Sequence, residues 1–318
     1  MNVTASIPLP IRPALAAGAI AVGAVATVSA ASADIRVVAS IKPVHSLVSA
    51  VMAGTGEPRL LMRGRASPHT FTLRPSDAAA LAEADVVFLI DELMETSLAR
   101  SVEALAGKAR VVALADAKGL VRRSLREGGA FEADSERDHD DGHDHGTFDM
   151  HVWLDPVNGR AMARAIARAL SQADPANAAS YDANARALVP RLDALTGQIS
   201  AELAPVRGKP FVVYHDGYRY FEDRFGLKSV GSVVVSPERS PGAKRLRRLR
   251  AKMREFDVAC VFAEPQFNMR IVDVVLEGSR MRSGVVDPLG ADIEDGPELY
   301  FTLLRNMAAA FKGCLAPG

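Results

Sequence analysis

The sequence predicts an α/β protein of two lobes, each with a roughly four-stranded, mainly parallel sheet flanked by helices, joined by a long linker helix. Short, uninterrupted runs of Val, Ile and Leu alternate with helical patterns, as expected for parallel strands buried on both faces. This alternation occurs twice, with the acidic stretch 134–146 and then two helical patterns between the two series. A length of 318 residues also suits two domains.

In the N-terminal series, the apolar runs predict strands at residues 35–39, 59–62, 86–90 and 110–114. Helical spacing of apolar residues predicts helices at 43–52, 75–83 and 94–105. Strands and helices in this order form βαβ units, which build parallel sheets.

Two helices are predicted next, at 158–173 and from Asp174-Pro175 to about 204. Pro190 lies inside the second helix and should kink it or split it. The C-terminal series then predicts strands at 210–214, 230–235, 258–263 and 284–286, and helices at 217–225, 241–256, 270–277 and 297–311. We therefore expect an N-terminal lobe at 34–157, linker helices at 158–207 and a C-terminal lobe at 208–318.

The first 33 residues differ from the rest of the chain. An apolar run at 14–28 follows Arg12, and Ala31-Ser32-Ala33 fits a small-x-small cleavage pattern. We expect a secretory signal at 1–33 that is cleaved after Ala33. A membrane anchor is the alternative, but the run is short for a spanning helix.

Charge argues against a nucleic-acid partner, because 38 Lys and Arg residues are balanced by 38 Asp and Glu residues. The basic run 244–254 is predicted to be an amphipathic helix, since Leu246, Leu249 and Met253 recur at helical spacing within it.

The chain has two cysteines, Cys260 and Cys314. An exported chain meets oxidising conditions, which favours a disulfide between them. Two buried free thiols are the alternative.

Three of the seven histidines, His139, His143 and His145, lie in an acidic stretch at 134–146. Imidazoles and carboxylates at this density are ligands that transition metals accept. The stretch should be a mobile loop, either an accessory metal site or a solvated linker without a metal role.

Other candidate ligands lie where predicted strands end. His215, Glu264 and Asp287 directly follow strands of the C-terminal series, and His69 and His151 lie in N-terminal loops. Ligands of open α/β sheets bind beyond the carboxyl ends of the strands, so a cleft between the lobes could collect these side chains. Three imidazoles and one carboxylate oxygen form a tetrahedral zinc site, although a single histidine at a strand end is more often structural.

Several segments together carry a family resemblance: 67–77 (SPHTFTLRPSD), 148–156 (FDMHVWLDP), 214–221 (YHDGYRYF), 260–267 (CVFAEPQF) and 287–290 (DPLG). Through them the mature chain resembles the zinc-binding solute receptors of bacterial zinc-uptake ABC transporters, which are metal-specific periplasmic binding proteins. The acidic histidine-rich loop is a feature of that family too.

The resemblance implies two α/β lobes joined by a rigid long helix, with Zn²⁺ held between them by His69, His151 and His215. Some zinc receptors have Glu before the first ligand histidine, where this chain has Pro68. Asp287 matches the carboxylate that completes the site in related metal receptors, so the resemblance implies Asp287 as the fourth ligand, with water as the alternative.

The resemblance also implies a disulfide between Cys260 and Cys314 and a metal role for the 134–146 loop. Glu264 is expected to orient a ligand histidine rather than to bind the metal.

The sequence thus predicts a periplasmic binding protein, not an enzyme, that captures Zn²⁺ and delivers it to the permease of an ABC transporter. We expect a monomer, with a periplasmic zinc chaperone as a further partner. One rival is a manganese or iron(II) receptor of the same fold, which two histidines and two carboxylates would suit better. A zinc hydrolase would need an open metal position and a base such as Glu264, but no HExxH motif is present. A surface adhesin on this scaffold is a third rival.

Overall fold

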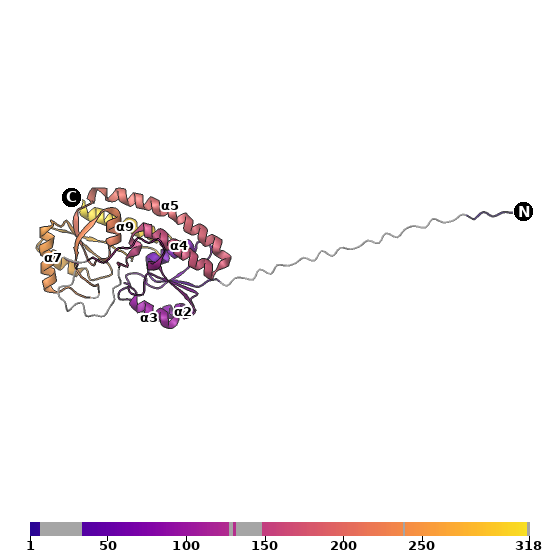
Figure 1. The fold of residues 1–318 in the computed structure, drawn as a ribbon, viewed down its shortest axis with the longest axis horizontal. Coiled ribbons are helices and arrows are strands. Elements are labelled where there is room, and N and C mark those ends of the chain that lie inside the picture. The colour runs from indigo at the N-terminus through magenta and orange to yellow at the C-terminus, as the bar shows by residue number, and fades with distance from the viewer. Residues whose placement is uncertain (7–33, 127–129, 132–147, 238, 317–318) are drawn as a thin grey trace. The chain divides into compact units, whose positions relative to one another are not determined.

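Two separate four-stranded sheets organise the part of the chain that the structure describes (Figure 1). The computed structural model describes residues 1–6, 34–126, 130–131, 148–237 and 239–316. Most of the predicted signal and the whole histidine-rich stretch 134–146 therefore lie outside the described residues. Among the described helices, none combines the length and apolar character that crossing a membrane requires.

The N-terminal sheet has the strand order β2-β1-β3-β4, and its strands pair in parallel. Its strands are β1 (Val37–Ala39), β2 (Arg59–Leu60), β3 (Val86–Leu89) and β4 (Arg110–Ala113), and its helices are α1 (Lys42–Val51), α2 (Pro75–Glu83) and α3 (Thr96–Leu105). Every residue of β1 and β3 is buried, which explains their unbroken apolar sequences. The predicted elements of this half are present, with ends that shift by one or two residues.

The C-terminal sheet has the strand order β6-β5-β7-β8, again with parallel pairing. Its strands are β5 (Pro210–Val213), β6 (Lys228–Ser232), β7 (Cys260–Ala263) and β8 (Arg282–Val285), and its helices are α6 (Arg219–Phe225), α7 (Ala243–Glu255), α8 (Arg270–Leu276) and α9 (Leu299–Leu315). Leu249 and Met253 of α7 are buried, as its amphipathic pattern predicts. Arg245 is buried as well, and its guanidinium donates to the carbonyls of Val233 and Ser232.

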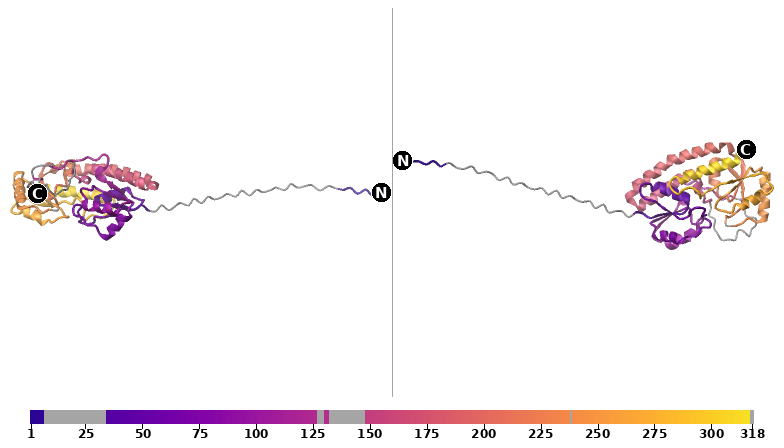
Figure 2. Two further views of the ribbon diagram at one scale, coloured as in Figure 1. Left: turned by 60° about the horizontal axis from the view of Figure 1, so that its bottom comes forward. Right: turned by 180° about the vertical axis from the view of Figure 1, so that it is seen from behind.

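Two linker helices connect the sheets: α4 (Pro156–Ala173) and α5 (Ala178–Leu203). At 26 residues, α5 is about 39 Å long, and it contacts both α1 and α9. Figures 1 and 2 show it arching past both sheets with α9 beside it. The helix is continuous through Pro190, so the predicted split does not occur. Pro190 is exposed, and a missing N–H on the solvent side is compatible with a gentle curve.

We call the β1–β4 sheet with α1–α3 the N-terminal lobe, and the β5–β8 sheet with α6–α9 the C-terminal lobe. The main hydrophobic core runs through both lobes and the linker helices, and a second cluster packs beneath α7 and α8. A disulfide joins Cys260 on β7 to Cys314 on α9, as predicted. Contacts group residues 34–318 into one compact unit, so the lobe boundaries after residues 157 and 207 remain a prediction.

Candidate metal centre

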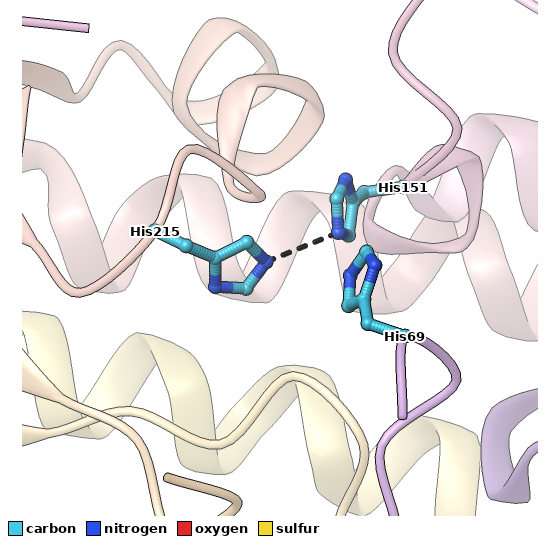
Figure 3. Close-up of side chains that lie close together, drawn as sticks. All are labelled: His69, His151 and His215. Atoms are coloured by element: carbon cyan, nitrogen blue, oxygen red, sulfur yellow. Dashed lines mark hydrogen bonds between the residues drawn. The ribbon is translucent and has the colours of Figure 1, made fainter. Parts of the chain in front are cut away.

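Three histidines from separate segments meet between the lobes (Figure 3). His69 lies in the loop between β2 and α2, His151 precedes the first turn before α4, and His215 follows β5 by two residues. One ligand nitrogen from each lies within 4.8 Å of the others. His151 and His215 are buried and His69 is half-buried, so the group is shielded but open on the His69 side.

The backbone around His151 is fixed by the start of α4. Asp155 caps this helix by accepting a hydrogen bond from Val157 N, and Pro156 occupies its first position. Trp153 packs beside the His151 ring and donates its indole N–H to the carbonyl of Pro288 in the C-terminal lobe (2.9 Å). These contacts hold His151 at the junction of the two lobes.

A carboxylate orients each of the two buried imidazoles. His151 Nδ1 lies 2.7 Å from Asp149 Oδ1, and His215 Nδ1 lies 2.7 Å from Glu264 Oε1. Because a carboxylate accepts hydrogen bonds, each Nδ1 carries a proton and each Nε2 can present a lone pair. The predicted role of Glu264, to orient a ligand histidine, agrees with this geometry. Sequence analysis missed Asp149, because nothing in the sequence distinguishes it from other acidic residues that lie near a histidine.

The two Nε2 atoms of His151 and His215 are 3.2 Å apart. Without an ion, this distance is that of a hydrogen bond, in which one ring carries a proton on Nε2. With both protons on Nδ1, the two lone pairs would face each other and could both bind one cation. Two nitrogens bound tetrahedrally to one Zn²⁺ at about 2.05 Å would be about 3.3 Å apart. The spacing therefore fits a single transition-metal ion.

Buried carboxylates make the surroundings of the histidines favourable for a cation. Burial alone lowers the pKa of His215, but the charge and hydrogen bond of Glu264 outweigh it and raise the pKa overall. Burial raises the pKa of Asp216 to about 6, although Arg126 opposes this effect. Glu264 itself is buried beside His215, so its charge acts at short range.

Asp287, the predicted fourth ligand, lies outside the histidine group. Its Oδ1 accepts hydrogen bonds from Leu289 N, Gly290 N and the side-chain amide of Gln266, at 2.7–2.9 Å. Its Oδ2 accepts a hydrogen bond from Ala291 N (2.6 Å). In this structure Asp287 thus organises the loop after β8.

Among the described histidines, His45 is not part of this group. His45 is buried in α1, and its Nε2 lies 3.0 Å from the carbonyl oxygen of Pro58. This hydrogen bond suits a structural role. His139, His143 and His145 lie outside the described residues.

Comparison with known proteins shows the family to which the chain belongs. The family model described as "Zinc-uptake complex component A periplasmic" matches residues 37–314. A protein of Brucella suis named "High-affinity zinc uptake system protein ZnuA" is 47% identical, and the alignment covers 88% of this chain and 91% of that protein.

Solved structures share the fold. A crystal structure of ZnuA superposes with a TM-score of 0.75 at 22% identity, covering 89% of this chain and all of that one. The laminin-binding protein of Streptococcus agalactiae, described as having adhesin and metal-transporting activity, gives a TM-score of 0.72 at 26% identity with the same 89% coverage of this chain.

Proposed function

Because the chain belongs to the family of periplasmic zinc-uptake components, we propose that it captures Zn²⁺ with His69, His151 and His215 and delivers it to the permease of an ABC transporter. Such a protein is a receptor and not an enzyme. The ion is its cargo, held between the lobes until it is passed on.

The 3.2 Å separation of the two Nε2 atoms is the observation that carries this proposal. Two hydrogen bonds from Nδ1 to carboxylates prepare both lone pairs in advance. Because the imidazoles are already oriented before the ion binds, little conformational entropy is lost on binding, which favours tight binding.

The fourth position of the ion is best supplied by a solvent molecule. Both oxygens of Asp287 already accept hydrogen bonds from backbone N–H groups, so moving this carboxylate to the ion would break the loop that it holds. Water was the alternative that the sequence left open, and it requires no such rearrangement.

The donor set favours zinc over manganese or iron(II). Imidazole suits zinc, whereas manganese prefers carboxylate oxygens, and the described group contains three histidines and no carboxylate. A hydrolytic role is also disfavoured, because Glu264, the candidate base, is engaged by His215 Nδ1.

Export completes the proposal. We expect cleavage after Ala33, a mature monomer in the periplasm, the permease as membrane partner and a zinc chaperone as a further partner. The basis is the sequence pattern at 1–33 together with family membership.

The test is calorimetric titration of the metal-free chain 34–318 with Zn²⁺ and, separately, with Mn²⁺. We expect one tight zinc, no tight manganese, and a loss of affinity of more than about 100-fold in His215→Ala. His45→Ala is the matched control, because His45 is also a buried histidine but lies outside the group.

A second variant separates the cleft from the loop. In a chain with His139, His143 and His145 replaced by Ala, the tight zinc should remain. Loss of tight binding in that variant, with tight binding retained in His215→Ala, would mean that the wrong histidines have been assigned.

A further inference from the structure

A strap of chain, residues 121–126, leaves the N-terminal lobe after β4 and lies against α6 of the C-terminal lobe. Arg123 N donates to the hydroxyl of Tyr220 (3.1 Å), and the Arg123 carbonyl accepts from Asp149 N (2.8 Å). The Tyr220 hydroxyl in turn donates to the Asp149 carbonyl (2.7 Å). Consecutive hydrogen bonds therefore join the strap, α6 and the residue that orients His151.

Arg126, at the end of this strap, places its guanidinium among polar groups of the C-terminal lobe. It donates to Glu222 (2.8 Å) and to Ser229 (2.5 Å), and one of its nitrogens lies 3.2 Å from Asp216. The Arg126 side chain is 15% exposed and that of Glu222 is 2% exposed. Several acceptors hold this buried guanidinium in a single orientation. Removing it would leave the buried carboxylates without a counterion.

Asp216 connects this cluster to the metal centre because it directly follows His215 in the chain. The turn is tight, with Gly217 N donating to the His215 carbonyl (2.9 Å). The backbone of Gly217 also lies against the ring, since a Cβ added there would be 2.5 Å from His215 Nε2. A shift of this turn would therefore move the imidazole.

We propose that Arg126 is a positioning residue for the metal centre. It holds the turn of residues 215–217 against the strap that supports Asp149, and so keeps the two Nε2 atoms at the separation that one ion requires. The inference rests on the proposed zinc binding. Arg126 donates to none of the three histidines, and it slows zinc release by restricting the movement through which His215 leaves the ion.

Arg224, on α6, provides a matched control for Arg126. Its guanidinium also joins α6 to another element, the start of α4, through two hydrogen bonds to the buried carboxylate of Asp155 (2.8 and 2.7 Å). Asp155 caps α4, and the hydrogen bonds described for its carboxylate go to Val157 N and Arg224, not to the 215–217 turn. Loss of this pair should loosen the fold without freeing His215.

The experiment compares Arg126→Lys with Arg224→Lys. Lysine keeps the charge but loses the planar fork that binds several acceptors at once. Zinc release from the loaded chain into excess chromophoric chelator is followed by stopped flow, and thermal unfolding is measured in parallel. We expect release about tenfold faster in Arg126→Lys and changed by less than about twofold in Arg224→Lys, with similar losses of thermal stability. Glu222→Gln should accelerate release in the same direction as Arg126→Lys.

Hydrogen exchange of the metal-free chain gives a readout that is independent of zinc. The amide of Gly217 should exchange faster in Arg126→Lys than in Arg224→Lys. Equal acceleration of release in both arginine variants, or no acceleration in Arg126→Lys, would overturn the assignment. A wild-type chain that binds no zinc would instead overturn the proposed function.

Discussion

Asp149 and Glu264 each fix the orientation of one buried imidazole. Each accepts a hydrogen bond from Nδ1, so that Nε2 faces the histidine group. Glu264 follows β7, the strand beside β5, so its position was predictable once His215 had been placed after β5. Asp149 lies in a segment without regular structure, and only the fold shows that it turns back to His151.

Replacing these carboxylates by amides should weaken zinc binding without removing a ligand. Glu264→Gln and Asp149→Asn keep an acceptor oxygen but remove the negative charge that increases the basicity of the imidazole, so each should lower affinity by about tenfold. Competition with a chelator of known affinity measures this loss. Gln266→Ala, which alters a neighbour that is bonded to Asp287 instead, should have little effect, and equal losses in all three variants would contradict the argument.

Glu95 is a buried carboxyl group away from the candidate centre. Its Oε2 accepts from Ile90 N (2.6 Å) and Asp91 N (3.3 Å), and burial raises its pKa from 4.5 to about 7. The folded chain therefore keeps this proton to a higher pH than the unfolded chain. The contribution of Glu95 to stability is fully present below about pH 4.5 and is lost as the pH rises through 7.

Glu95→Gln should remove this pH dependence, since an amide stays neutral. Between pH 5 and pH 8, the unfolding free energy of the wild type should fall by about 2 kcal/mol relative to the variant. Urea unfolding at several pH values measures the difference. Glu83→Gln, at an exposed position, is the control, and parallel curves for wild type and Glu95→Gln would refute the prediction.

At the scale of elements, the sequence predicts strands best where burial alone determines them. The apolar run 86–90 predicts β3 to within one residue. β6 differs, because it begins at Lys228 and includes Ser229, two polar residues ahead of the apolar run. Ser229 is buried and hydrogen-bonded to Glu222 of α6, a partner that local sequence cannot reveal. Pro190 does not interrupt α5, because it lies on the exposed side of the helix, and the local sequence does not show which side that is.

The disulfide between β7 and α9 joins two elements that are far apart in sequence. Cys260 and Cys314 are separated by 54 residues, and closing a loop of this size in the unfolded chain is worth roughly 4 kcal/mol in the chain-entropy model. Cys260→Ser with Cys314→Ser should lower the unfolding free energy by up to about this amount, as measured by urea denaturation. Zinc affinity should change little, because neither sulfur belongs to the histidine group. Unchanged stability would show that the cross-link has no such role.

At the scale of the whole molecule, the core and the candidate centre both bridge the lobes. The main hydrophobic cluster includes residues of both sheets and of the linker helices, so the chain should unfold as one cooperative unit. The motifs that carry the family resemblance pointed to the three candidate ligand histidines, which the fold brings together. They could not predict the hydrogen bonds of Asp287, because these depend on the loop that encloses it.

Zinc should raise the stability of this whole unit. Free zinc at 100 times its dissociation constant adds about 2.7 kcal/mol, which corresponds to a rise in Tm of about 5 °C for a chain of this size. Calorimetry of the metal-free and zinc-loaded chain should show a single transition in each case. Two transitions, of which zinc moves only one, would show that the lobes unfold separately.

Trp153 has a consequence for optical measurements on the unmodified chain. It is the only tryptophan in the sequence, its ring centroid lies 5.2 Å from that of His151, and its N–H donates to Pro288 across the lobe junction. All indole fluorescence therefore originates beside the candidate centre. A cation on His151 would alter the emission intensity, whereas separation of the lobes would expose the indole to water and shift the emission to longer wavelength. One natural fluorophore would thus distinguish occupancy from opening without any label.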